Sequence, residues 1–150
     1  MKATSFNLFD QDGKVRSYAD YLGKWLIVYF YPKDDTPGCT KEACSFRDGS
    51  EEFKKLGVEI VGISKDSVSS HKKFQEKHKL NFTLLSDPDH KIIESYGAWG
   101  KKSMFGRVFE GIKRNTYIIN PTGVIVKSYE NVNPLKHSKQ ILKDLKVLIC

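Results

Sequence analysis

The 150-residue sequence predicts one α/β domain, residues 1–150, in which helices cover both faces of a mixed central sheet. Two continuous apolar and β-branched runs, 25–31 and 58–64, are typical of strands buried on both faces. A helical segment follows each of these strands, and an antiparallel hairpin with a final helix ends the chain. No repeat, low-complexity tract or Pro/Gly/Ser-rich linker divides the sequence. Alternation followed by a hairpin therefore predicts a mixed sheet rather than a purely parallel one.

The first half of the chain predicts a short hairpin, the first buried strand, a long helix and the second buried strand. Residues 5–9 and 14–17 form the hairpin strands around a polar turn. The long helix covers about 39–55, bends near Gly49 and is closed by Gly57.

The second half predicts a polar surface helix, a short strand, another helix, an antiparallel hairpin and a closing helix. Proline suits the first turn of a helix, so Ser86-Asp87-Pro88 predicts the beginning of the helix after the short strand. The five elements lie at 68–78, 83–85, 86–96, 115–119 with 124–129, and 134–148. A thioredoxin-like sandwich fits this order of elements.

The net charge of +7 raises the possibility of nucleic-acid binding. The lysines, however, are scattered among acidic residues without a dense run, which favours a solvated basic surface. That surface could still assist the docking of an acidic protein. No run approaches the roughly 20 apolar residues that cross a bilayer, and residues 1–6 lack the pattern of a signal peptide. We expect a cytoplasmic protein that binds neither nucleic acid nor membrane.

Three cysteines are too few and too badly placed for a disulfide scaffold. They are therefore either inert core residues or chemically active thiols. Cys150 is the final residue, and a bystander thiol is a better interpretation of it than an intermolecular tether. The four histidines show no ligand spacing with the cysteines, so we expect surface positions and no metal site. They are His71, His78, His90 and His137.

Cys39 falls where the first buried strand has ended and a helix begins. Thr36 can cap this helix, Pro37 fits its first position, and Gly38 lets the backbone approach another group closely. Cys39 then lies in the first turn, where unpaired N–H groups and the helix dipole favour the nucleophilic thiolate. The alternative is a small core residue at a loop–helix junction. Asp34 would disfavour a thiolate if it pointed inward, as would Asp35, and we expect both to face solvent.

A resemblance to a known family supports the reactive interpretation. Pro32-x-x-x-Thr36-x-x-Cys39, with Glu42 three residues on, is similar to the peroxiredoxin active-site motif. Residues 30–48 (FYPKDDTPGCTKEACSFRD) resemble the subfamily called peroxiredoxin Q or bacterioferritin comigratory protein. Residues 111–119 resemble the segment that supplies the catalytic arginine of that family, and 96–100 also fit.

The resemblance implies a thiol-dependent peroxidase that reduces hydrogen peroxide and organic (alkyl) hydroperoxides. In this family Cys39 would attack the O–O bond and become a sulfenic acid. Thr36 would hydrogen-bond the peroxide, and Arg114 would hold the thiolate and stabilise the leaving oxygen. Pro32 and Gly38 would line the substrate pocket, with Pro32 excluding water. Glu42 would orient the arginine or the helix start, although a solvated helix carboxylate is the alternative.

Cys44 lies where the subfamily places its resolving cysteine. Five residues of helix would leave the two Cα atoms roughly 8.6 Å apart, whereas a disulfide needs about 6.8 Å or less. We therefore expect the first turns to unwind after oxidation, with Gly38 and Gly49 lowering the cost. A buried core residue on the inner helix face is the alternative for Cys44.

Thiol–disulfide exchange must then regenerate the enzyme, which implies thioredoxin or a similar dithiol reductant. No haem, flavin or metal motif is present, and the resemblance implies no cofactor. It also favours a monomer. Two rival functions are a thioredoxin-type disulfide reductase, whose Cys-x-x-Cys is missing, and a redox-switched sensor or chaperone that uses the same cysteine pair. Trp99, Met104 and Phe105 could form an apolar wall for organic hydroperoxides or could pack in the core.

Overall fold

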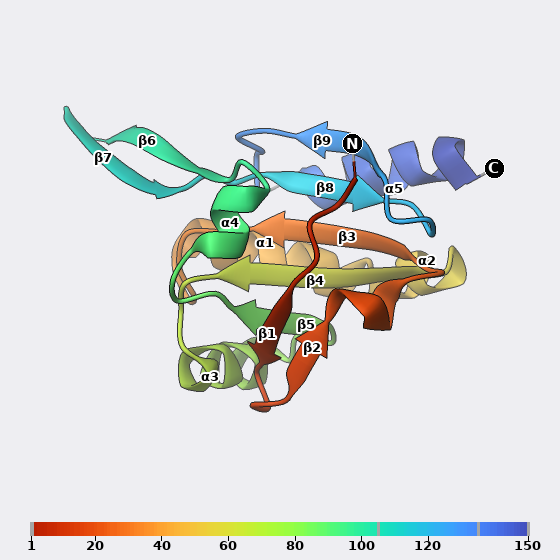
Figure 1. Cartoon of the computed structure of the whole chain (residues 1–150), viewed down its shortest axis with the longest axis horizontal. Helices are drawn as coiled ribbons and strands as arrows, with labels where there is room; N and C mark the ends of the chain where they lie inside the picture. Colours follow the sequence, from red (N-terminus) through yellow and green to blue (C-terminus); the bar gives the residue numbers. More distant parts are fainter. Residues whose placement is uncertain (1, 105, 135, 150) are drawn as a thin grey trace.

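A seven-stranded mixed sheet organises the chain in the computed structural model, which describes residues 2–104, 106–134 and 136–149 (Figure 1). Its strands are β1 Asn7–Asp10, β2 Val15–Ser17, β3 Trp25–Phe30, β4 Val58–Ser64, β5 Thr83–Ser86, β8 Thr116–Ile119 and β9 Ile125–Tyr129. They lie in the order β2-β1-β5-β4-β3-β8-β9. β3 pairs with β4 and β4 with β5 in parallel, and the other neighbours are antiparallel. The predicted mixed sheet is confirmed.

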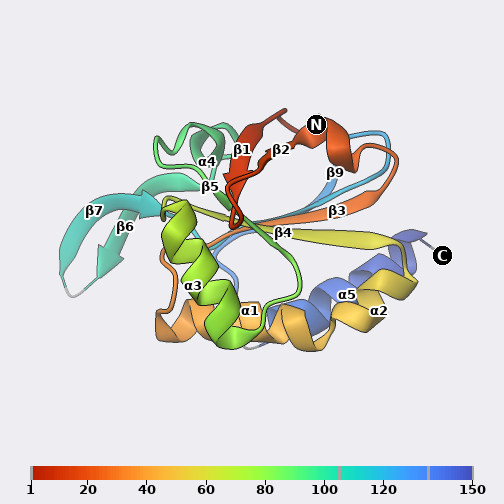
Figure 2. The same ribbon diagram turned by 90° about the horizontal axis from the view of Figure 1, so that it is seen from below.

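Helices cover the two faces of the sheet unequally (Figure 2). They are η1 Tyr18–Tyr21, α1 Pro37–Asp48, α2 Ser50–Lys55, α3 Val68–His78, α4 Lys91–Ser95 and α5 His137–Ile149. The longer α1, α3 and α5 pack on one face with α2, whereas the short α4 and η1 cover the other. No helix among the described residues is long and apolar enough to cross a membrane.

Strand β3 has apolar residues at every position because both of its faces are covered. Ile27 and Tyr29 belong to the hydrophobic cluster under the longer helices, and Leu26 and Val28 to the cluster on the opposite face. Successive strand residues point to opposite faces, so a strand covered on both sides has no polar side. Its carboxyl end leads into the loop before α1.

Gly49 divides the long helix that the sequence predicts into two. α1 ends at Asp48, Gly49 has φ −89° and ψ 1°, and α2 begins at Ser50. Gly57 follows α2 with a φ of +74°, a conformation that glycine adopts without strain. The predicted bend and the closing glycine are therefore confirmed.

The structure of residues 86–112 differs from expectation in two ways. The helix expected at 86–96 is only α4, because Pro88 lies in a turn and His90 has a left-handed φ of 48°. The sequence also gave no prediction of β6 Trp99–Met104 and β7 Arg107–Ile112, which pair as a hairpin that projects from the main sheet (Figure 1). Glycines and charges interrupt this segment, and most of β7 is exposed, so it lacks the apolar alternation of a core strand.

The prediction of four surface histidines is wrong for two of them. His71 is fully buried among polar partners, and His137 is buried edge-on against Phe46 and Tyr129. Burial lowers the pKa of His137 to about 4, so this ring is neutral at physiological pH. The other two, on α3 and before α4, are partly exposed.

Trp99 packs against the core cluster beside α4, with its ring stacked on His90 at 3.9 Å. This favours the packing interpretation for Trp99. Phe105 and the side chain of Met104 lie outside the described residues.

Candidate active site

Cys39 is the third residue of α1, directly beyond the carboxyl end of β3. Pro37 occupies the first helical position, as predicted, and the Cys39 side chain is only 1% exposed. Thr36 precedes the helix, and its carbonyl accepts a hydrogen bond from the Thr40 N–H at 2.8 Å. Its hydroxyl does not cap the helix as expected, because it donates to the Lys33 carbonyl at 2.9 Å.

Arg114 reaches Cys39 across the sheet. β8 pairs antiparallel with β3, and the Phe30 N–H donates to the Asn115 carbonyl at 2.8 Å, so the residue before Asn115 lies beside the start of α1. Arg114 Nη2 lies 3.4 Å from Cys39 Sγ, and Nη1 donates to Glu42 Oε1 at 3.2 Å. The structure therefore brings together a thiol, a guanidinium and a carboxylate in one contiguous group.

Gly38 makes the approach of Arg114 possible. A Cβ at this position would lie 3.2 Å from Arg114 Nη2, which is tighter than nine in ten real Cβ contacts. The predicted close approach is thus confirmed, and the group that approaches is the guanidinium.

Glu42 and Arg114 titrate abnormally because they are buried together. Burial raises the pKa of Glu42 to about 7, although Arg114 opposes the rise. Burial acts to lower the pKa of Arg114, but the negative charges of a Cys39 thiolate and of Glu42 outweigh it and raise the pKa overall. Glu42 Oε2 has no hydrogen-bond partner within the described part of the chain. The alternative of a solvated helix carboxylate is excluded, because Glu42 is 1% exposed.

The loop between β3 and α1 departs from expectation at one aspartate. Asp35 is exposed, as predicted. Asp34 is instead buried, because its carboxylate accepts hydrogen bonds from Tyr31 at 2.6 Å and Ser70 at 2.8 Å and pairs with His71 at 2.7 Å. Pro32 is partly buried at the beginning of the same loop.

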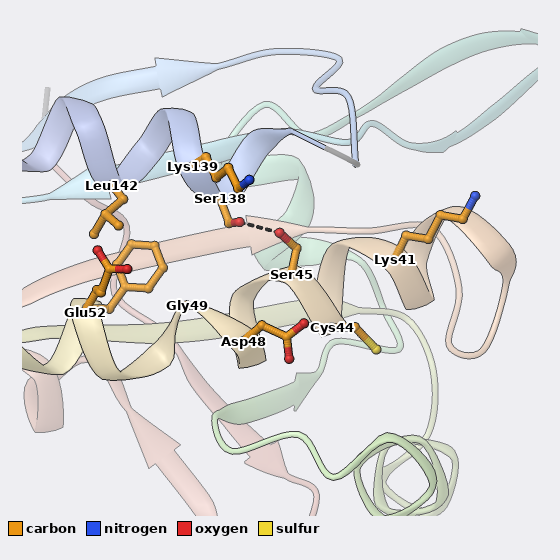
Figure 3. Close-up of a pocket in the computed structure, with 10 residues that line it drawn as sticks. Lys41, Cys44, Ser45, Asp48, Gly49, Glu52, Ser138, Lys139 and Leu142 are labelled. Carbon is orange, nitrogen blue, oxygen red and sulfur yellow. Dashed lines mark hydrogen bonds between the residues drawn. The ribbon is translucent and has the colours of Figure 1, made fainter.

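Cys44 lies on the same unbroken helix as Cys39, and both are free thiols. It is half-buried at a groove of about 440 Å³ between α1, α2 and α5 (Figure 3). A hydrogen bond between Ser45 and Ser138 joins α1 to α5 across this groove. Cys44 is therefore not the fully buried core residue of the alternative interpretation.

Sequence reasoning missed the polar cluster behind the loop that joins β3 to α1. Asp34, Asp66 and His71 offer ligand atoms within 4.8 Å of one another, which is close enough to hold a metal ion. The carboxylates of Asp34 and Asp66 and both ring nitrogens of His71 already make hydrogen bonds within the protein. Each of these groups therefore has a partner without a metal ion. His71 carried no spacing signal with the cysteines, and its partner Asp34 is 37 residues away along the chain.

Comparisons with known proteins agree with this geometry. The family model described as AhpC/TSA family matches residues 1–128. Peroxiredoxin Bcp of Bacillus subtilis is 43% identical over 97% of this chain and 92% of its own length, and Peroxiredoxin Bcp of Escherichia coli K12 is 44% identical over 96% and 92%. A structure of Xanthomonas campestris peroxiredoxin Q superposes with a TM-score of 0.92 at 36% identity, covering 97% of this chain and 92% of that one.

The chain therefore belongs to the AhpC/TSA family, as the resemblance predicts. Its likeness within that family is to peroxiredoxins of the Bcp or peroxiredoxin Q type, which makes it a peroxidase on a thioredoxin fold.

Proposed function

We propose that this peroxidase reduces hydrogen peroxide and alkyl hydroperoxides through Cys39, uses Cys44 to resolve the product, and is recycled by thioredoxin or a similar dithiol. The observation that carries the proposal is the contact of Arg114 Nη2 with the Cys39 sulfur at 3.4 Å, at the first turn of α1. The alkyl substrates gain support from a related Xanthomonas campestris bacterioferritin comigratory protein, whose structure is described in terms of its alkyl peroxide reduction activity.

The first step is an in-line attack by the Cys39 thiolate on one peroxide oxygen. An S–O bond forms, the O–O bond breaks, and the leaving oxygen departs with the electron pair and takes up a proton as water or alcohol. Arg114 stabilises both the thiolate and the negative charge on the leaving oxygen. Thr36 turns its hydroxyl from Lys33 to the peroxide, while Pro32 limits access of water.

Glu42 acts in this step through Arg114. Its Oε1 holds Nη1, which leaves Nη2 directed at the Cys39 sulfur. Gly38 keeps the space between the helix and the guanidinium open. Both residues are therefore assigned a positioning role at the substrate pocket.

The second step requires α1 to unwind. Cys44 Sγ attacks the sulfenic sulfur of Cys39, a disulfide forms, and the hydroxyl leaves as water. An intact helix holds the two Cα atoms roughly 8.6 Å apart, beyond the reach of a disulfide. Gly38 precedes Cys39 and Gly49 ends α1, so the segment that unwinds is bounded by flexible residues. A dithiol then reduces the disulfide and restores both thiols.

The proposal also covers the compartment, the oligomeric state and the docking partner of the enzyme. Three cysteines that form no disulfide scaffold fit a reducing compartment, so we assign the protein to the cytoplasm. We also propose that it is a monomer. The charge of +7 favours an acidic reductant as docking partner.

The test is peroxide turnover coupled to a thioredoxin system for wild type, Cys39→Ser, Cys44→Ser and Cys150→Ser. Cys39→Ser should consume no peroxide, because no other thiol contacts Arg114 among the described residues. Cys44→Ser should react once per chain and then fail to recycle through thioredoxin. Cys150→Ser serves as the matched control and should keep wild-type turnover. Full activity of Cys39→Ser would falsify the assignment.

A further inference from the structure

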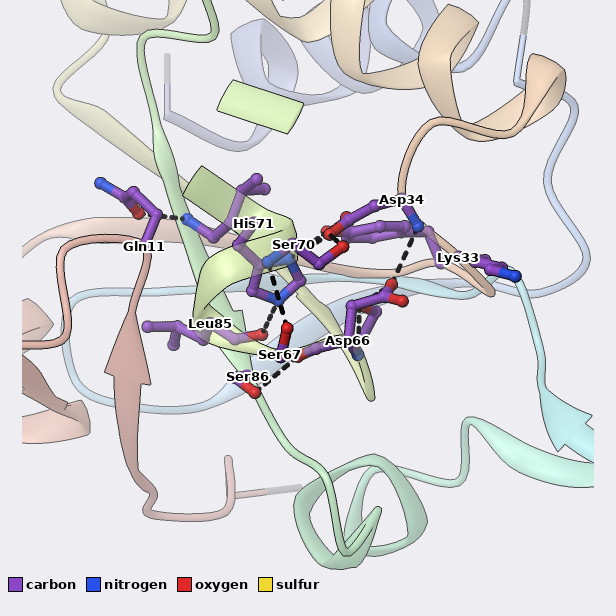
Figure 4. A network of polar contacts seen from close by, with 12 residues as sticks. Gln11, Lys33, Asp34, Asp66, Ser67, Ser70, His71, Leu85 and Ser86 are labelled. Atoms are coloured by element: carbon purple, nitrogen blue, oxygen red, sulfur yellow. Dashed lines mark hydrogen bonds and ion pairs between the residues drawn. The ribbon is translucent and has the colours of Figure 1, made fainter. Parts of the chain in front are cut away.

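The loop that carries Pro32 and Thr36 is fastened at Asp34 to the polar cluster behind the site (Figure 4). The Asp34 N–H donates to Asp66 Oδ2 at 2.9 Å, and Asp66 Oδ2 also accepts from the Ser64 hydroxyl at 2.7 Å. Ser64 is the last residue of the central strand β4. The main chain of the loop is thereby tied to the sheet.

The side chain of Asp34 makes a second connection, to helix α3. Its Oδ2 contacts Ser70 Oγ at 2.8 Å and His71 Nδ1 at 2.7 Å, while Oδ1 accepts from Tyr31 at 2.6 Å. His71 Nε2 lies 3.0 Å from the Leu85 carbonyl on β5. A carbonyl and a carboxylate only accept hydrogen bonds, so Nε2 donates to Leu85 and Nδ1 donates to Asp34, and the ring bridges β5 to the loop between β3 and α1.

Asp35 adds a third connection on the surface. Its backbone φ is 59°, an unfavourable conformation for a residue with a side chain. Its carboxylate pairs with Lys77 Nζ at 2.7 Å and His78 Nε2 at 3.0 Å, at the end of α3. Helix α3 thus holds two consecutive aspartates of the loop, Asp34 near the beginning of the helix and Asp35 at its end.

The position of the loop determines the position of the reacting groups. Thr36 lies two residues after Asp34, its hydroxyl bonds back to Lys33, and its carbonyl accepts the first helical bond of α1 from Thr40. A shift at Asp34 would therefore displace Thr36 and the first turn with Cys39. Shifts of about 1 Å at a reacting centre can reduce rates by about 100-fold.

We propose that His71 is a positioning residue for the peroxidase reaction: through Asp34 it clamps the loop of Pro32 and Thr36 to the sheet, so that Cys39 meets peroxide in the reactive geometry. This inference rests on the proposed role of Cys39. The clamp, which His71 and Asp34 form, is buried. It is attached to β4, β5 and α3 and lies outside α1. It keeps Pro32 and Thr36 in place while α1 unwinds for the second step.

The test uses the variant Cys44→Ser, Cys150→Ser as parent, because Cys39 is then its only thiol. Two matched pairs are added to this parent. His71→Asn puts an N–H at the position of Nδ1 and keeps the bond to Asp34, whereas His71→Gln puts one at Nε2 and loses that bond. Ser70→Ala removes a donor to Asp34, whereas Ser69→Ala changes an exposed neighbour on the same helix.

Two rates are measured on each fully reduced protein: oxidation of Cys39 by hydrogen peroxide, and alkylation of Cys39 by iodoacetamide. Alkylation needs a thiolate but neither Thr36 nor the peroxide geometry. We expect His71→Gln to slow the peroxide reaction roughly 10- to 100-fold and His71→Asn to restore most of it. Ser70→Ala should slow it less, Ser69→Ala should match the parent, and alkylation should stay within about twofold throughout.

Several outcomes overturn the clamp. The first is an unchanged peroxide rate in both His71→Gln and Ser70→Ala. The second is an equal loss of peroxide rate in His71→Asn and His71→Gln. The third is an alkylation rate that falls in parallel with the peroxide rate. If His71→Gln does not fold, the Ser70→Ala and Ser69→Ala pair decides. A parent that fails to react with peroxide contradicts the proposed role of Cys39, and the clamp fails with it.

Discussion

Gly38 and Glu42 flank Cys39 in sequence and set where its arginine lies. Gly38 lets Nη2 of Arg114 approach the helix, and Glu42 holds Nη1 from the next turn. Neither residue contacts the Cys39 sulfur through a hydrogen bond, yet each limits the positions that the guanidinium can take. Small changes at these two positions should therefore alter the peroxide reaction without removing a reacting group.

Gly38→Ala should slow the reaction of Cys39 with peroxide roughly three- to tenfold. A Cβ 3.2 Å from Arg114 Nη2 forces the guanidinium to shift by a few tenths of an ångström. Alanine is a better helix residue than glycine, so the melting temperature should stay level or rise. Stopped-flow oxidation and thermal unfolding measure the two effects. A wild-type rate in this variant would show that the close approach is unimportant.

Glu42 should make the stability of the protein depend on pH. Burial raises its pKa from 4.5 to about 7, so the folded protein binds a proton that the unfolded chain has released. The stability contributed by that proton is fully present below about pH 4.5 and is lost as the pH rises through 7, by about 3 kcal/mol. Glu42→Gln should remove this slope. The free energy of unfolding of the wild type and of Glu42→Gln, measured with urea at pH 5 and pH 8, tests this. The prediction is contradicted if the two proteins differ by the same amount at both pH values.

At the scale of elements, the proposed cycle gives α1 two tasks that conflict. Folded, it places Cys39 beside Arg114; unwound, it allows Cys44 to reach Cys39. Its packing on α5 therefore affects how readily the second step occurs. The Ser45–Ser138 hydrogen bond is the polar part of that packing, and Phe46 against His137 is an aromatic part.

Ser138→Ala should accelerate formation of the Cys39–Cys44 disulfide. Loss of one hydrogen bond lowers the stability of the folded α1 by about 1 kcal/mol, which raises the unwound population about fivefold. Disulfide formation after a single peroxide pulse, followed by quenching and mass analysis, measures the rate. Lys139→Ala, at the next position on the same groove, is the control and should leave it unchanged. An unchanged rate in Ser138→Ala would mean that α1 unwinds without releasing α5, and a slower rate would contradict the prediction.

At the scale of the molecule, the sheet topology assembles the site from distant segments. Arg114 lies 75 residues from Cys39, and antiparallel pairing of β8 with β3 brings it to the start of α1. Parallel pairing of β3, β4 and β5 likewise brings Ser64, Asp66 and Leu85 behind the loop that holds Asp34. Both groups lie where the central strands end, which is where open α/β sheets bind ligands.

The sequence predicted those parts of the fold in which burial leaves a pattern of apolar residues along the chain. The runs at 25–31 and 58–64 indicated the central strands because residues covered on both faces must be apolar. The hairpin β6–β7 was not predictable in the same way, since most of β7 is exposed and the segment carries no apolar alternation. Short α4 was overestimated, because Pro88 fits a turn as well as a helix start.

By itself, the sequence determined the mixed α/β fold, the position of Cys39 in the first turn of α1 and the family, because these depend on contiguous residues and their spacing. Only the tertiary structure decided that Glu42 and Asp34 are buried and that His71 bridges β5 to the loop between β3 and α1. A polar residue in a sequence looks solvated by default. Whether it is buried depends on partners from other elements, such as Arg114 for Glu42 and His71 for Asp34, which only the folded chain brings together.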